Sequence, residues 1–68
     1  MYMDFFQIGD RVRLSDEMLS YSANKHWSGK KGTIIQFSGS YTLIKWDHLE
    51  NPIWQHNRRH LQLADVNY

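Results

Sequence analysis

Two short runs rich in β-branched and aromatic residues constrain the fold of this 68-residue chain more than any other feature. The first run reads Gly32-Thr-Ile-Ile-Gln-Phe, and the second reads Tyr41-Thr-Leu-Ile-Lys-Trp. Between them lies Ser-Gly-Ser, with Gly39 at its centre. This pattern predicts a β-hairpin with a three-residue turn, and it therefore indicates a small all-β domain.

Both faces of the predicted hairpin carry apolar residues. In the first strand, alternation puts Ile34 and Gln36 on one face. It puts Thr33, Ile35 and Phe37 on the other face. In the second strand, it separates Thr42, Ile44 and Trp46 from Tyr41, Leu43 and Lys45. Two partly apolar faces indicate a sheet that curls, as the sheets of small barrels do. We expect Ile34, Ile44 and Trp46 to belong to the core.

The segment before the hairpin predicts one strand and a long loop. Gly9-Asp10 forms a turn, and residues 11–14 alternate apolar and charged side chains as a strand does. The expected core residues here are Phe6, Ile8, Val12 and Leu14. Ser15 is placed to cap a short helix, and residues 20–24 are interpreted as loop. A first loop over residues 15–28 is long for so small a domain, which makes it a candidate functional element.

The segment after the hairpin predicts two more strands. A turn over residues 47–52 ends at Pro52, which cannot donate a ladder hydrogen bond. Residues 53–56 form a strand, residues 57–60 one tight helical turn, and residues 61–63 the last strand, with a tail at 64–68. Five short strands in one domain predict a five-stranded small barrel over about residues 8–63.

Composition limits the classes of function. The chain has no cysteine, which fits a reducing compartment and excludes a disulfide scaffold or a thiolate metal site. Its net charge of +1 does not by itself demand a nucleic-acid partner. No apolar run is long enough to span a membrane, and the N-terminus lacks the pattern of a signal peptide, so we expect a cytoplasmic protein. Self-association as a homo-oligomer is one route to added stability.

Several short motifs resemble those of a known fold group. Gly9-Asp-Arg-Val12 resembles the entry to an SH3-like barrel, and Gly29-Lys-Lys-Gly-Thr-Ile34 resembles a KOW-type strand entry. More narrowly, the segment from Gly32 through Ile44-Lys-Trp-Asp47 to Leu61 is similar to short SH3-like proteins encoded by phages and prophages. This resemblance implies an SH3-like barrel with one helical turn before the last strand. It implies no particular chemistry.

Basic and aromatic residues gather in two segments and predict a nucleic-acid site. Lys25, Lys30 and Lys31 bracket Trp27, and Arg58 and Arg59 occupy the predicted helical turn. Cations contact phosphates, and a tryptophan ring offers a face on which an unpaired base can stack. If the two segments lie on adjoining edges, they form a small footprint for nucleic acid or a nucleoprotein complex. The alternative is a solvated rim neutralised by nearby carboxylates.

A protein-binding function is the alternative that the aromatic residues favour. Interfaces are enriched in Trp, Tyr, Met and Arg. The candidate residues are Met18, Leu19, Tyr21, Trp27, Tyr41 and Trp54. The four aromatic residues would form an exposed groove, with Met18 and Leu19 of the long loop beside it, through which an adaptor or inhibitor docks a host protein.

An enzymatic or metal-binding function has little support. Imidazole is a common metal ligand, and the chain has His48, His56 and His60 close together in sequence. They do not fall into a known metal-binding motif, so we expect no metal and no cofactor. We find no phosphate loop, no cysteine nucleophile and no paired carboxylates in a plausible cleft, so we expect no catalytic residues. Gly9-Asp-Arg-Val12 also resembles plasmid-encoded type II dihydrofolate reductases, whose pore carries a Val-Gln-Ile-Tyr segment. The matching Ile53-Trp-Gln-His56 lacks the tyrosine, so we expect a non-enzyme.

Overall fold

A computed structural model describes residues 6–64, which form one five-stranded antiparallel sheet and three short helical segments. In chain order the elements are β1 (Arg11–Leu14), α1 (Asp16–Leu19), the 3₁₀ helix η1 (Ser22–Trp27), β2 (Gly32–Ser38), β3 (Tyr41–Trp46), β4 (Ile53–His56), the 3₁₀ turn η2 (Arg58–His60) and β5 (Leu61–Leu63). The strand order is β4-β3-β2-β1-β5. The prediction of a small all-β fold is confirmed. Of the tail expected at residues 64–68, only Ala64 is among the described residues.

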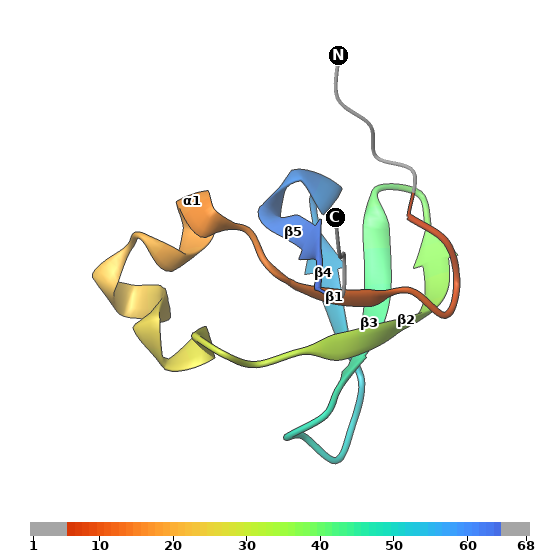
Figure 1. The fold of residues 1–68 in the computed structure, drawn as a ribbon. Helices are drawn as coiled ribbons and strands as arrows, with labels where there is room; N and C mark the ends of the chain where they lie inside the picture. Colours follow the sequence, from red (N-terminus) through yellow and green to blue (C-terminus); the bar gives the residue numbers. More distant parts are fainter. Residues whose placement is uncertain (1–5, 65–68) are drawn as a thin grey trace.

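The sheet is strongly curved, so that β1 and β2 cross in front of β3 (Figure 1). The α1–η1 segment stands at one end of the molecule, and the turn between β2 and β3 lies at the other end (Figure 1). No helix within residues 6–64 has the length and apolar character needed to cross a membrane.

One side of the sheet buries the core. Its buried hydrophobic residues are Val12, Leu14, Ile34, Ile44, Trp46 and Leu61. They come from β1, β2, β3 and β5 and occupy alternate positions, because successive side chains of a strand point to opposite faces. The prediction that Ile34, Ile44 and Trp46 form core is therefore confirmed. Phe6 packs against this cluster as expected, although it is only partly buried.

A β-bulge in β2 changes which residues share a face. Ile34 pairs with Ile44, but the next pair is Gln36 with Leu43, so Ile35 is the extra residue. The alternation shifts at that point, and Phe37, opposite Thr42, packs against the core on the same side as Ile34. The prediction that put Phe37 with Thr33 and Ile35 is wrong, because simple alternation assumes a strand without a bulge.

Two turns also differ from expectation. Ser38 pairs directly with Tyr41, so the hairpin turn has two residues rather than three, with Gly39 at a φ of 60°. Ile8 is wrong as a core residue, since 66% of it is exposed. Ile8 and Gly9 form a turn in which the Gly9 N–H donates to the Ile34 carbonyl at 2.7 Å. The backbone of this turn is pinned to β2, and the Ile8 side chain stays outside.

The segment between β1 and β2 is helical over most of its length. Ser15 caps α1 as predicted, its hydroxyl accepting from the Met18 N–H at 3.2 Å. The loop predicted for residues 20–24 is wrong from Ser22 onward, where η1 begins. The Asn24 side-chain amide donates to the Met18 carbonyl at 2.9 Å and joins η1 to α1. A short helix held by such polar contacts has no apolar periodicity for sequence reasoning to detect.

Candidate nucleic-acid interface

The second face of β3 carries three residues of contrasting chemistry. Tyr41, Leu43 and Lys45 alternate with three buried residues, so all three point to the side of the sheet away from the core. We call this side the outer face. Lys45 and Leu43 are half-buried there, and Tyr41 is exposed. The outward row of β3 therefore runs from an aromatic ring at the hairpin turn to an ammonium group at the other end of the strand.

Pairing with β4 builds an aromatic cluster at the hairpin end of the outer face. Leu43 lies opposite Trp54, and Tyr41 lies opposite His56, with the Tyr41 and His56 ring centroids 4.7 Å apart. Tyr41 is 46% exposed and Trp54 is 45% exposed. Together with Ser38, these two residues line a hollow of about 320 Å³. Such a hollow is at the lower end of the sizes typical of ligand sites.

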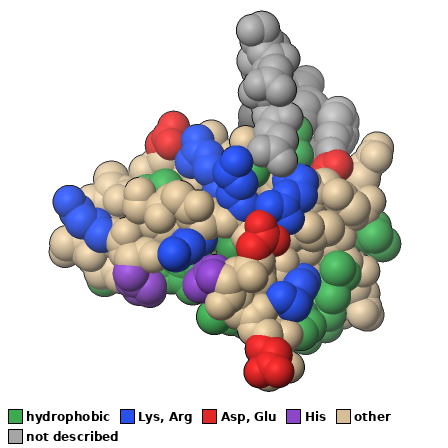
Figure 2. All heavy atoms as spheres, turned by 60° about the horizontal axis from the view of Figure 1, so that its bottom comes forward, with side chains coloured by type: hydrophobic (Ala, Val, Ile, Leu, Met, Phe, Trp, Pro, Cys, Tyr) green, Lys and Arg blue, Asp and Glu red, His purple; other side chains and the backbone are tan. Residues whose placement is uncertain are grey.

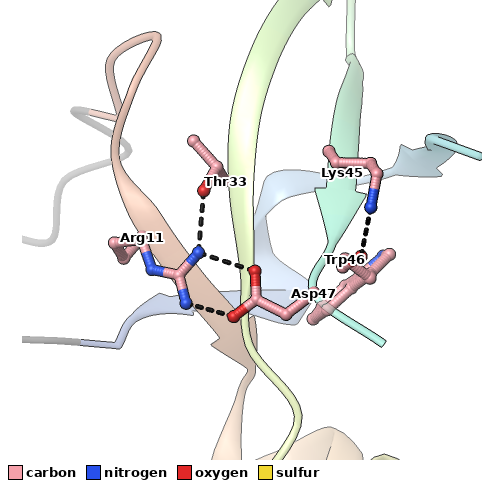
Figure 3. A network of polar contacts seen from close by, with 5 residues as sticks. All are labelled: Arg11, Thr33, Lys45, Trp46 and Asp47. Carbon is pink, nitrogen blue, oxygen red and sulfur yellow. Dashed lines mark hydrogen bonds and ion pairs between the residues drawn. The ribbon is translucent and has the colours of Figure 1, made fainter. Parts of the chain in front are cut away.

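Pairing with β2 and β1 builds a basic row at the other end of the outer face. Lys45 lies opposite Thr33, and Thr33 lies opposite Arg11. The Arg11 guanidinium donates to the Thr33 hydroxyl and to Asp47 Oδ1, each at 2.8 Å, and its second nitrogen bonds Asp47 Oδ2 (Figure 3). Lys45 Nζ donates to the Trp46 carbonyl at 3.0 Å and also to the Leu49 carbonyl. These contacts fix both cations on the sheet.

Two more cations extend this basic row. Arg13, two residues after Arg11, forms an ion pair with Asp16 at 3.1 Å. Lys31 precedes β2, and its carbonyl accepts the Asp47 N–H at 2.9 Å, which places its backbone beside Asp47. The four cations Arg11, Arg13, Lys31 and Lys45 thus outnumber the two carboxylates. In Figure 2, Lys and Arg side chains gather on one face around an acidic side chain, with hydrophobic side chains adjoining them at one edge.

The charge of Asp47 is set by its neighbour. The hydrogen bond from Arg11 lowers the pKa of this carboxyl group below its ordinary value, and the positive charges of Arg11, Lys45 and His48 act in the same direction. Asp47 is therefore a carboxylate at neutral pH and offsets one of the surrounding cations. The remaining excess charge is positive.

The first predicted basic segment is only partly on the outer face. Lys30 and Lys31 lead into β2 and adjoin the basic row, whereas Lys25 is exposed on η1. Trp27 is half-buried, with its ring centroid 4.9 Å from that of Trp46 and 5.3 Å from that of His48. Trp27 thus packs on the core instead of presenting a free ring.

The second predicted basic segment lies at the far end of β2. The Arg58 guanidinium sits 4.6 Å from the centre of the Phe37 ring, and its Nη2 donates to the Gly39 carbonyl at 2.7 Å. Arg59 is exposed on η2, and its N–H donates to the Asn57 side chain at 2.9 Å. Because Gly39 follows the end of β2 and Lys31 precedes its start, the structure does not join the two predicted segments into one patch.

The predicted protein-binding residues also divide between two ends of the molecule. Met18, Leu19 and Trp27 are partly buried against the core. Tyr21, at the start of η1, is 54% exposed. Tyr41 and Trp54 line instead the hollow near the turn between β2 and β3. The single groove expected from the sequence is therefore not assembled.

Sequence reasoning missed Arg11, Arg13 and Lys45 as site residues. Alternation with buried neighbours marks each of them as outward, but only the strand register puts Arg11 and Lys45 on either side of Thr33. Among residues 6–64, no three His, Asp or Glu side chains are grouped closely enough to hold a metal ion. Comparison with known protein families, curated protein sequences and solved structures finds no match to this chain.

Proposed function

We propose that this protein is a non-enzymatic binding module that holds single-stranded nucleic acid, alone or within a nucleoprotein complex, on its outer face. The observation that carries the proposal is the outward row of β3, which joins the exposed aromatic cluster to the basic row. Proteins that bind single strands combine cations that follow the phosphates with aromatic side chains on which bases stack. The outer face offers both within one sheet.

We also infer that the curved sheet is that of an SH3-like small barrel, of the kind that phages and prophages encode. The strand order, the antiparallel pairing of β1 with both β2 and β5, and the 3₁₀ turn before β5 support this inference. A chain without cysteine suits work in the cytoplasm, where nucleic acids of phage and host are found.

A host protein is the second candidate partner. The observation that favours it is the hollow beside Tyr41 and Trp54, because aromatic residues around a depression are also typical of peptide-binding surfaces. Such binding would depend mainly on apolar contact and only weakly on salt. Nucleic-acid binding would depend strongly on salt, since each phosphate contact releases counterions.

The test is a titration of labelled single-stranded and duplex oligonucleotides at about 50 and about 200 mM salt. An oligonucleotide of about 12 nucleotides is within the range that one small binding fold covers. We expect the single strand to bind more tightly than the duplex. With about three phosphate contacts, each contributing about 0.7 to the logarithmic salt slope, its affinity should fall roughly 20-fold between the two salt concentrations.

Matched double variants locate the surface. Arg13→Gln/Lys45→Gln removes two cations from the outer face and should lower the salt slope by about 1.4. Lys25→Gln/Arg59→Gln removes the same charge from η1 and η2 and should leave the slope unchanged. No binding at the lower salt concentration, or equal effects of the two double variants, would contradict the proposal. Capture of a protein without nucleic-acid binding would favour the second candidate.

A further inference from the structure

We propose that the hollow bounded by Tyr41, Trp54 and Ser38 is a subsite for one unpaired nucleobase. This inference rests on the proposed function, because it names the part of the nucleic acid that the aromatic end of the outer face receives. The ligand at that end of the face would be a flat, uncharged ring attached to a phosphate backbone.

The spacing of the two aromatic residues suits a flat ring. Tyr41 lies opposite His56, and Trp54 is two residues before His56 on β4, so Tyr41 and Trp54 are diagonal neighbours. Diagonal residue positions on one face of an antiparallel pair are about 7–8 Å apart, which is within reach of aromatic side chains. Because both side chains line the same hollow, one planar ring that enters it could contact both of them.

The contacts around Tyr41 favour a site that exists before the ligand arrives. The His56 ring lies 4.7 Å from the Tyr41 ring at an interplanar angle of 31°, so it restricts how Tyr41 can turn. Leu43, between Tyr41 and Lys45 on the outer face, lies directly opposite Trp54, so an apolar side chain adjoins the indole. Ring positions that are already fixed reduce the entropy lost on binding.

The neighbouring charge favours a nucleotide over an isolated apolar group. Lys45 is four residues from Tyr41 along β3, a distance of about 14 Å at the rise of an antiparallel strand. A strand whose base enters the hollow would therefore pass the basic row within a few nucleotides. Stacking accepts every base, so this subsite should hold its base without strong sequence preference.

The decisive experiment compares two polymers of equal length and charge on the full chain. One is single-stranded oligothymidylate, and the other is the same sugar–phosphate backbone without bases. We expect the abasic polymer to bind at least about fivefold more weakly, because stacking of one base contributes a factor of this size or more. Trp54→Ala and Tyr41→Ala should each weaken oligothymidylate binding at least about fivefold and leave abasic binding unchanged. Tyr21→Ala, an exposed aromatic at the other end, is the matched control and should bind as wild type.

A spectroscopic readout separates stacking from a loss of fold. Stacking of a base on Trp54 should quench part of the tryptophan fluorescence, whereas Trp46 is buried and Trp27 half-buried. In Trp54→Phe, which retains an aromatic ring, that quenching should disappear while binding persists. If oligothymidylate and the abasic polymer bind equally and Trp54→Ala has no effect, the proposal of a base subsite is overturned, whereas the proposed function stands. If neither polymer binds at low salt, the proposed function is overturned as well.

Discussion

At the scale of single residues, Gly32 is required for the close approach of β2 to β3. It lies opposite Trp46, and a Cβ atom there would be 2.6 Å from Ile44 Cγ2, 3.0 Å from the Lys45 carbonyl oxygen and 3.1 Å from Trp46 Cα. Two of these atoms belong to the backbone, so the strands would have to move apart. The absence of a side chain at this position lets the core pair of Ile34 and Ile44 close.

Gly32→Ala should therefore lower the free energy of unfolding by about 1–3 kcal/mol, the usual cost of overpacking. That is a large share of the roughly 3–5 kcal/mol that the core of so small a domain supplies. Urea unfolding followed by far-ultraviolet circular dichroism measures the change. Gly39→Asn is the control, because its site is open and asparagine tolerates a φ of 60°, so its change should stay within about 0.5 kcal/mol. Equal stability of Gly32→Ala and wild type would show that the strands separate at no cost.

At the scale of elements, η2 depends on one residue with an unusual backbone. Asn57 has a φ of 77° and a ψ of 99°, and its side chain accepts the Arg59 N–H at 2.9 Å. It thus turns the chain out of β4 and caps the 3₁₀ turn that leads into β5. A positive φ is strained for a residue with a Cβ atom, and asparagine is among the residues that adopt it most readily.

A pair of substitutions separates these two roles of Asn57. Asn57→Ala keeps a Cβ atom at the positive φ but loses the side-chain amide that caps η2 and eases this conformation, which should cost about 2 kcal/mol of stability. Asn57→Gly loses the same cap without the strain, so it should cost less than the alanine variant. Thermal and urea unfolding of both proteins give the comparison. If the glycine variant is the less stable of the two, backbone strain at this position is not the main cause of the instability of Asn57→Ala.

The elements also show what sequence can predict. Strand β4 has the expected bounds, because Pro52 precedes it and Asn57 ends it. The bulge at Ile35 escaped prediction, because it arises from the pairing of β2 with β3 and not from any residue preference within β2. The candidate site was missed for a related reason. Lys31 could be identified from local composition, but Arg11 and Lys45 become neighbours of one threonine only through the register of three strands.

At the scale of the whole molecule, the ion pair of Arg11 and Asp47 links β1 to the turn that follows β3. The pKa of Asp47 is lowered in the folded protein, so its carboxylate stabilises the fold at any pH above the unfolded-state pKa of about 3.9. This contribution is lost as the pH falls from there through the lowered pKa of the folded state. The stability of the entire sheet should therefore decline with acid in this range.

Asp47→Asn should be less stable than wild type at neutral pH, and the difference should shrink as the pH falls below about 4. Urea unfolding midpoints at a series of pH values measure the two curves. Glu50→Gln, in the same turn, provides a matched loss of one carboxylate. If the difference between Asp47→Asn and wild type stays constant down to low pH, the contact acts through its shape rather than its charge.

The alternation along β3 has a consequence for how this chain can evolve. Thr42, Ile44 and Trp46 are buried on the core side of the sheet, where a substitution would disturb packing, whereas Tyr41, Leu43 and Lys45 face outward and are at most half-buried. Odd and even positions of one six-residue strand can thus change at different rates. A lineage that acquires a new partner would substitute residues at the odd, outward positions of β3 and keep the buried residues at the even positions.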